Sequence, residues 1–321
     1  MPKLSLAVMI TTHNRLDDLK RTLNRLESLS PKPDEILVTA DGCHDGTEEW
    51  LRENGDNIRL FANSPGKGSI ASRHNMMLSA ESEFVVSLDD DSYPAEANSL
   101  AVIEAWMKEN ENVAVLTFPQ RSEEYPESLT QHHLPSFGYS GSFPNSGACY
   151  RRSVYSQLPG FNTSFFHAYE EPDYALQCIA EGLAVYHSNI ATIRHHYSSV
   201  GRNEVRTHHR HARNEFWSTL VQSPWFVIPF VVLYRALRQM QFAFKHGGLQ
   251  WLLKEPVWWC STFGGIWTSL KRRTPVSLAA YSMWIRLMRK PFTDSSLWDD
   301  YTKRIDNSIA KQTKLDPSQI S

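Results

Sequence analysis

The sequence predicts an α/β protein in which a mostly parallel sheet is flanked by helices, and three observations lead to this prediction. Short apolar runs alternate with segments whose apolar residues recur every three or four positions through the first hundred residues, as buried strands and amphipathic helices do. Such alternation favours parallel strands joined by right-handed crossovers. Three consecutive carboxylates, Asp89 to Asp91, follow directly on the apolar run 84–88, as expected where a strand ends at the ligand-binding edge of such a sheet.

The individual elements follow from the same periodicities. Leucines at positions 16, 19, 23, 26 and 29 share one face of the first helix, and Pro31 stops that helix. Thr47 is placed to cap the short helix after the second strand. Further helices are expected at residues 70–80 and 96–110. Strands are expected at residues 4–10, 35–40, 58–62, 84–88 and 113–118.

Two segments beyond the fifth strand bear on function. Residues 119–146 have little periodicity and many aromatic residues, prolines and glycines, so we expect a binding loop or a lid there. A helix is expected to begin near Pro172 and to end at Gly182. Glu171 and Asp173 then lie at a helix N-terminus, where the dipole is expected to keep carboxylates ionised. Plain charge capping explains them as well as a catalytic role does.

The acidic triplet is the strongest candidate for a functional site. Adjacent carboxylates repel one another, and either solvation or a divalent cation relieves that repulsion. Oxygen ligands suit Mg²⁺ or Mn²⁺ better than zinc, whereas a solvated acidic turn is the alternative. Because the carboxyl ends of parallel strands share one edge of the sheet, Thr12, Asn14 and Asp41 are expected to converge with the triplet on one crevice.

The charge divides the chain into an acidic and a basic part. The net charge is −2, but residues 1–200 carry a net −12, whereas residues 201–290 carry a net +11 together with seven of the ten tryptophans. We therefore expect a catalytic domain at 1–200, a basic helical region at 201–298 and a polar, loosely held tail at 299–321. The acidic first part argues against binding of nucleic acid.

Three apolar and aromatic stretches of the basic part, starting at Trp225, Pro256 and Met283, lead into lysine and arginine residues. They are too short to span a bilayer, and helices of this kind lie in the interface of an anionic leaflet. Ordinary packing on the catalytic domain and a homodimer interface are the alternatives. The four cysteines show no paired spacing, and the N-terminus lacks a signal-peptide core. We therefore expect a cytoplasmic protein, peripheral on the inner face of the cell membrane.

Five motifs in a fixed order carry a family resemblance. They are Thr11-Thr12-His13-Asn14-Arg15, the segment 41–47 (Asp-Gly-Cys-His-Asp-Gly-Thr), the segment 63–68 leading to Arg73-His74-Asn75, the run Leu88-Asp89-Asp90-Asp91, and the segment 165–173 (Phe-Phe-His-Ala-Tyr-Glu-Glu-Pro-Asp). With these motifs the sequence resembles an inverting glycosyltransferase of family 2 with the GT-A fold, closely over residues 4–200.

The resemblance implies a nucleotide-diphosphate-sugar donor, linked to UDP, dTDP or GDP, and a glycan or lipid-linked acceptor of polysaccharide biosynthesis. It implies that Asp41 meets the base or ribose, that Thr12 and Asn14 line the nucleotide pocket, and that Arg73 can reach the diphosphate. Lys67 belongs to the same donor-binding set. A helix-surface arginine that is simply solvated is the alternative for Arg73.

The resemblance also implies the roles of the acids. Asp91 would ligate Mg²⁺ or Mn²⁺, Asp89 would bind the ribose, a metal-bound water or the metal, and Asp90 would support either. Glu171 stands where the family usually has the aspartate base, and Asp173 is the second candidate. Of the paired histidines after a short strand at 191–194, the resemblance favours His196 over His195 near the metal or the diphosphate, while hydrogen-bonded polar residues are the alternative.

Two other functions compete with transfer of a sugar. A sugar nucleotidyltransferase would need a glycine-rich loop directly after the first strand, and residues 11–15 contain no glycine. A catalytically inactive nucleotide-sugar binder or membrane scaffold would keep the fold without the reaction. The cluster His208-His209-Arg210-His211 lacks the spaced cysteine or glutamate partners of a zinc site, so we interpret it as a helix surface.

Overall fold

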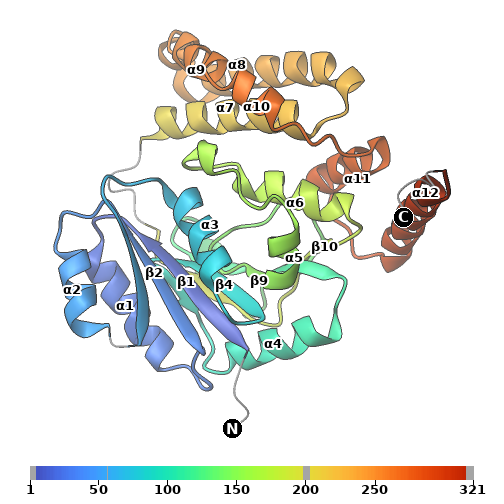
Figure 1. The fold of residues 1–321 in the computed structure, drawn as a ribbon. Coiled ribbons are helices and arrows are strands. Elements are labelled where there is room, and N and C mark those ends of the chain that lie inside the picture. The colour runs from blue at the N-terminus through green and yellow to red at the C-terminus, as the bar shows by residue number, and fades with distance from the viewer. Residues whose placement is uncertain (1–4, 56, 198–202, 316–321) are drawn as a thin grey trace, which may run out of the picture.

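The structure of the protein is a computed structural model, which describes residues 5–55, 57–197 and 203–315. Its centre is an eight-stranded sheet with the order β3-β2-β1-β4-β9-β6-β10-β8, seen in the lower half of Figure 1. The strands of this sheet are β1 (Leu6–Thr12), β2 (Glu35–Asp41), β3 (Ile58–Asn63), β4 (Phe84–Asp89), β6 (Val113–Thr117), β8 (Gly138–Tyr139), β9 (Cys149–Arg151) and β10 (Ala184–His187). The predicted α/β class with a mostly parallel sheet is confirmed.

The first four strands are parallel, and β9 runs antiparallel between β4 and β6. A second, three-stranded sheet has the order β5-β11-β7. Its strands are β5 (Ser92–Pro94), β7 (Gln120–Ser122) and β11 (Ile193–His195). Because β5 follows the acidic triplet at once and β11 ends at His195, this small sheet brings a distant segment of the chain to the triplet.

Side chains alternate between the two faces of β1, so the core divides into two clusters. One cluster combines Leu6, Val8 and Ile10 with α1 (Leu16–Glu27), α2 (Thr47–Asn54) and α4 (Ser99–Glu109). The other combines Ala7 and Met9 with α3 (Ser69–Ser79) and α5 (Arg152–Gln157). Helix α6 (Glu170–Ala180) contributes to both clusters. The two-sided burial explains why these strands read as continuous apolar runs.

The basic region forms a helical layer above the sheet (Figure 1). Its helices are α7 (Glu204–Gln222), α8 (Ile228–Leu252, kinked at Gly248), α9 (Glu255–Phe263) and α10 (Ile266–Lys271), and α7 packs against the other three. Within the described ranges, no helix combines the length and the apolar character needed to cross a bilayer.

The C-terminal segment returns to the sheet, which corrects the expectation of a loosely held tail for its first turns. After α11 (Leu278–Arg289), Phe292 pairs with Tyr139 of β8 as an antiparallel bridge. In α12 (Ser295–Leu315), Trp298 is 1% exposed and stacks on Tyr139 at a centroid distance of 5.0 Å. The hydroxyl of Tyr301 donates to the carbonyl of Ile179 at 2.5 Å. Residues 316–321 of the expected tail lie outside the described residues.

Candidate active site

The acidic triplet lies at the C-terminal end of β4, next to the end of β1, because Thr11 pairs with Asp89 in the sheet register. Arg15, in the turn after β1, donates from Nη1 to Asp90 Oδ1 at 2.9 Å and to Asp91 Oδ2 at 2.8 Å. Thr12 Oγ1 donates to Asp90 Oδ2 at 2.9 Å. The last residue of β1 therefore supplies the hydroxyl, and the turn after it the cation, that compensate two of the three acids.

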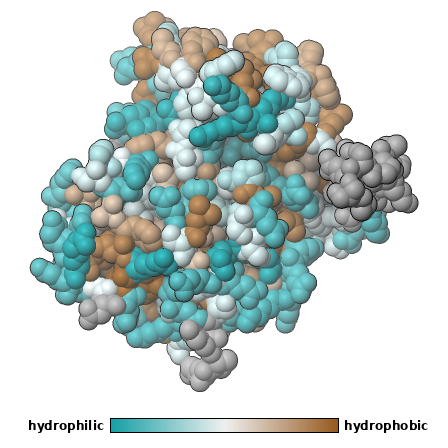
Figure 2. Space-filling view, in the orientation of Figure 1, coloured by the Kyte–Doolittle hydropathy of each residue, from teal (hydrophilic) through white to brown (hydrophobic). Residues whose placement is uncertain are grey.

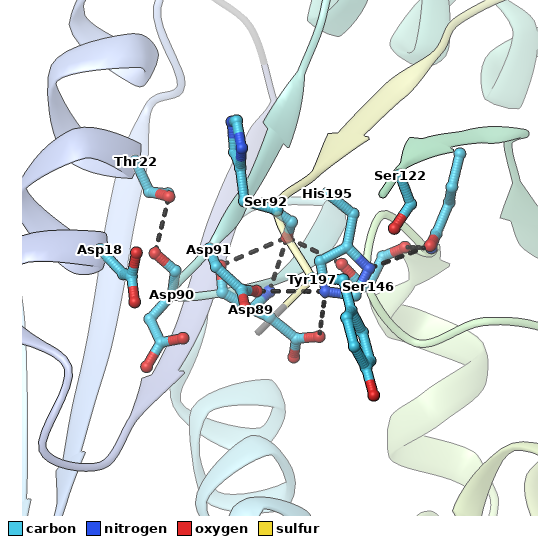
Figure 3. Close-up of polar contacts among 12 residues, drawn as sticks. Asp18, Thr22, Asp89, Asp90, Asp91, Ser92, Ser122, Ser146, His195 and Tyr197 are labelled. Atoms are coloured by element: carbon cyan, nitrogen blue, oxygen red, sulfur yellow. Dashed lines mark hydrogen bonds and ion pairs between the residues drawn. The ribbon is translucent and has the colours of Figure 1, made fainter. Parts of the chain in front are cut away.

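Asp89, Asp91 and His195 form a candidate metal centre. His195 Nε2 lies 3.1 Å from Asp91 Oδ1 and 3.8 Å from Asp89 Oδ2, and Figure 3 shows its ring facing both carboxylates. One possible ligand atom from each of the three residues lies within 4.8 Å of the others. Two carboxylates with one imidazole suit Mn²⁺ and also allow Mg²⁺. The side chains present therefore fit a divalent cation.

His196, which the resemblance favoured for this role, faces away from the triplet. Successive residues of an extended strand point to opposite sides, so only one of the two histidines can face the carboxylates. His196 Nε2 lies 3.0 Å from the hydroxyl of Tyr93, and its Nδ1 lies 3.5 Å from Glu123 Oε1. His195 is thus the histidine that the structure brings to the acids.

Asp90 and Asp91, the two buried acids of the triplet, differ in how readily they ionise. Burial raises the pKa of Asp90 to about 7, against the opposing charge of Arg15. Burial also disfavours ionisation of Asp91, but the hydrogen bond from His195 and the charges of His195 and Arg15 outweigh it, so the pKa of Asp91 is lowered. Asp91 is therefore the carboxylate best prepared to bind a cation, and Asp90 mainly holds Thr12 and Arg15.

Asp41 at the end of β2 organises the segment between β3 and α3. Its carboxylate accepts hydrogen bonds from the backbone N–H groups of Lys67 and Gly68, each at 2.8 Å, from Asn63 Nδ2 at 2.8 Å and from Ser72 Oγ at 3.2 Å. Lys67 contributes its backbone while its side chain is exposed. Asp41 thus fixes the segment between β3 and α3 beside the site.

Arg73 of α3 is buried and paired, in contrast to a solvated helix-surface arginine. It is 4% exposed. Its guanidinium pairs with Asp89, and Nη1 lies 3.6 Å from Glu170 Oε1. Arg73 therefore connects the acidic triplet to the first turn of α6, where the candidate bases are.

The loop before α6 has an unusual backbone. Phe166, Ala168 and Tyr169 have φ values of 68°, 71° and 75°, a left-handed conformation that costs non-glycine residues about 1–3 kcal/mol each. Asn214 of α7 is fully buried, and its Nδ2 donates to three carbonyls of this loop at 2.8 to 3.2 Å. Helix α7 therefore fixes the loop that sets the position of the α6 N-terminus.

The two candidate bases differ in their surroundings. Burial, reinforced by the adjacent carboxylate of Glu170, raises the pKa of Glu171 well above that of an ordinary glutamate. Burial raises the pKa of Asp173 to about 6, although Gln222 and Gln177 donate to its two oxygens at 2.6 and 3.2 Å. Desolvation therefore outweighs the helix dipole and raises the pKa of both acids, although a carboxyl with a pKa of about 6 is still mostly ionised at neutral pH. The contacts of Asp173 tie α6 to α7.

A cavity of about 1170 Å³ opens in front of the triplet, between the sheet edge and helices α7 and α8. It is lined by six of the residues predicted for the site: Thr12, Asp41, Arg73, Asp89, Asp90 and Asp91. Five other predicted residues are missing from the described lining: Asn14, Lys67, Glu171, Asp173 and His196. Asn14 Oδ1 instead accepts from the backbone of His44 at 2.6 Å.

Two features could not be placed correctly from the sequence: the role of Arg15 and the predicted lid at 119–146. The sequence prediction includes Arg15 only as part of a motif. Because Arg15 lies in the turn after β1, and β1 pairs with the strand that ends in the triplet, its position could have identified it as a partner of the triplet acids. The expected lid at 119–146 contributes β7, β8 and a short 3₁₀ helix (Pro126–Leu129), and none of its residues lines the cavity as described. Of its aromatic residues, Tyr139 belongs to the edge strand β8 and Phe143 packs in the core against Tyr150.

Comparison with known proteins identifies the family of the chain. The sequence model of Glycosyl transferase family 2 matches residues 7–225, which is most of the chain. No curated protein matches the sequence closely enough to count as a relative.

Solved structures share the fold at low identity. A mannosyltransferase from Pyrobaculum calidifontis, solved with GDP-Man and Mn²⁺, superposes with a TM-score of 0.54 at 15% identity over 98% of this chain and 87% of that one. S. aureus TarS 1–349 in complex with UDP-GlcNAc gives 0.55 at 15% identity over 96% and 92%. GalNAc-T7 with UDP, GalNAc and Mn²⁺ gives 0.56 at 13% identity over 70% of this chain, which spans about half (49%) of GalNAc-T7. With the family match over 7–225 and the GT-A architecture, the chain belongs to glycosyl transferase family 2 and is a glycosyltransferase.

Proposed function

We propose that the protein transfers a sugar from a nucleotide-diphosphate donor, bound in the cavity, to an acceptor hydroxyl with inversion at the anomeric carbon. The observation that carries this proposal is the convergence of Asp41, Asp89, Asp91, Arg73 and His195 on the edge of the 1170 Å³ cavity. A cavity of this size accommodates a ligand as large as a nucleotide sugar. Neighbours of the same fold solved with GDP-Man or UDP-GlcNAc support the donor class.

Asp89, Asp91 and His195 are the residues that would hold a divalent cation, Mn²⁺ or Mg²⁺. Such a cation, when bound, neutralises negative charge that develops on a departing diphosphate. The Mn²⁺ in the two neighbouring structures supports this assignment. Arg15 keeps Asp91 in place, since it bridges Asp90 and Asp91.

Glu171 is the residue that we assign as general base. Its raised pKa makes it a better proton acceptor than an ordinary glutamate. The neighbouring Glu170 is less available, because its Oε1 accepts from Asn145 Nδ2 at 3.3 Å and lies near Arg73. Removal of the acceptor proton by one carboxylate, opposite the leaving group, is a single displacement and inverts the anomeric configuration.

The helical layer supports a proposal about location and acceptor. Large apolar side chains of α8 to α10 are strongly exposed, among them Phe230 (76%), Leu253 (72%) and Trp267 (68%). Figure 2 shows hydrophobic residues gathered over this layer. The side chains of Lys245 and Lys271 in the same layer are exposed as well. We propose that this face lies on an anionic membrane surface, in the cytoplasm, and that the acceptor is a glycan or a lipid-linked sugar.

The test is a panel of UDP-, GDP- and dTDP-linked sugars with Mn²⁺ or Mg²⁺, in which release of the nucleoside diphosphate is measured. We expect release from at least one donor, loss of release on addition of EDTA, and loss in Asp91→Asn. Asp17→Asn, an exposed position on α1, is the matched control and should behave like the unsubstituted protein. Absence of release from every donor, or an Asp91→Asn variant as active as the control, would refute the proposal.

A further inference from the structure

A second group of metal-binding side chains lies in the helical layer, apart from the acidic triplet. His208 and His209 of α7 meet Glu255, the first residue of α9. His208 Nε2 lies 3.0 Å and His209 Nε2 3.5 Å from the same oxygen, Glu255 Oε1. One possible ligand atom from each of the three lies within 4.8 Å of the others. The helix surface expected from the sequence is wrong here, because Glu255, 47 residues after His208, supplies the missing partner.

The distances fit ligands that share one tetrahedral ion. With zinc–nitrogen and zinc–oxygen distances near 2.1 Å, a tetrahedral angle separates two ligand atoms by about 3.4 Å. The two observed nitrogen–oxygen distances of 3.0 and 3.5 Å lie on either side of that value. Two imidazoles and one carboxylate form a ligand set typical of zinc, with a fourth position left for water or another ligand.

The three side chains are held in place, as ligands of a metal usually are. The second oxygen of Glu255 accepts from the indole N–H of Trp258, which fixes the carboxylate from behind. The ring of His208 stacks on Phe242 at 4.9 Å with an interplanar angle of 14°. His208 and Glu255 are 8% and 4% exposed.

A simple histidine–carboxylate hydrogen bond does not account for the whole group. It satisfies His208, whose Nε2 bonds to Glu255. The buried Nε2 of His209, however, has only a longer contact of 3.5 Å with the same oxygen and no hydrogen bond of normal geometry among the described residues. A buried polar atom with so weak a partner is costly, and a shared ion would satisfy it.

We propose that His208, His209 and Glu255 bind a zinc-class divalent ion that links α7 to α9. This site is separate from the cation at the acidic triplet, although His208 also lines the cavity in front of that triplet. Since α7 also carries Asn214, which holds the loop before α6, the ion would stabilise the helix on which that loop depends. The site takes a softer cation than the triplet, because two of its three ligands are nitrogen.

The test is metal binding to the full chain in an Asp91→Asn background, which disables the triplet. Titration with Zn²⁺ by calorimetry, and with Co²⁺ by visible absorption, should show one equivalent and the intense bands of a four-coordinate cobalt site. Glu255→Gln and His209→Asn should each weaken binding at least about ten-fold. His132→Asn, an exposed histidine, should change nothing, and Mg²⁺ should not compete.

Thermal unfolding of the unsubstituted chain gives a second test, which does not depend on whether the variants fold. Zn²⁺ at micromolar concentration should raise the melting temperature, since an ion that binds only the folded state stabilises it, and EDTA should reverse the effect. Absence of stoichiometric uptake, absence of a shift, or unchanged affinity in Glu255→Gln would each overturn the site.

Discussion

The two carboxylates Glu171 and Asp173 at the start of α6 have different surroundings. Glu171 is half-buried beside Glu170, which lies close to the cavity-lining Arg73. Asp173 is 3% exposed and is engaged by Gln177 and Gln222. We therefore expect catalysis to depend on Glu171 and folding on Asp173, although the two residues are only two positions apart in the chain.

Glu171→Gln should lower kcat by about 10²–10⁴-fold with little change in folding, because it removes a proton acceptor and keeps the shape of the side chain. Asp173→Asn should keep kcat within a few-fold. It should also lower the free energy of unfolding by about 1–3 kcal/mol, since an amide cannot accept from both glutamines. Initial rates and urea unfolding of both variants check this, and the reverse pattern would assign the base to Asp173.

The pH dependence of the reaction should report the raised pKa of Glu171. A base works in its deprotonated form, so kcat/KM should rise with pH through this pKa and level off above it. Because the folded protein raises the pKa well above 4.5, the acid limb should lie well above that pH. A profile from about pH 5 to about pH 9 measures it, and a flat profile across that range would contradict the assignment.

At the scale of elements, the contact between α7 and the loop before α6 is the most consequential. Asn214→Ala would leave the carbonyls of His167 and Ala168 without their side-chain donor and that of Phe165 with Arg213 alone, next to residues that already hold a strained backbone. We expect a loss of about 1–3 kcal/mol in the free energy of unfolding and a fall in kcat, because the first turn of α6 shifts. Arg206→Ala, an exposed position of α7, is the control. Reduced stability with unchanged kcat would mean that the loop does not position Glu171.

Helix α12 makes a comparable contribution to the sheet. Trp298→Ala should lower the free energy of unfolding by about 3–5 kcal/mol, because it removes a fully buried ring that stacks on Tyr139. Chemical denaturation measures the effect. Asp300→Ala, exposed on the same helix, should be nearly neutral, and equal effects of the two substitutions would show that α12 is not part of the fold's core.

At the scale of the whole molecule, the separation of an acidic catalytic part from a basic helical layer predicts reversible binding to anionic membranes. The full chain should float with vesicles that contain anionic lipid and not with neutral ones, and salt should weaken the association. Phe230→Asp should abolish flotation, whereas Leu78→Asp should not, since Leu78 is 57% exposed on α3, outside the helical layer. Dimers in light scattering, with no flotation, would assign the face to a second copy.

The fold could be predicted largely because its signals are local. The strands and helices of the first hundred residues follow from apolar runs and periodic leucines, and the acids Asp41, Asp89 and Asp91 follow from strand ends. Contacts between distant segments had no such signal: Glu255 beside His208, Asn214 beneath the loop before α6, and Tyr139 paired with Phe292. The choice between His195 and His196 depended on which side of one short strand faces the triplet. The charge state of Glu171 depended on burial, which a helix-dipole argument leaves out.

The closing bridge between Tyr139 and Phe292 also bears on how the protein is made. Strand β8 stands at the margin of the large sheet, and the segment around Phe292 that pairs with it is translated long after β8 itself. While the chain is still on the ribosome, the catalytic sheet therefore carries an open margin able to pair with other nascent chains. Premature termination before Phe292 should yield aggregates in spite of an intact set of acidic residues.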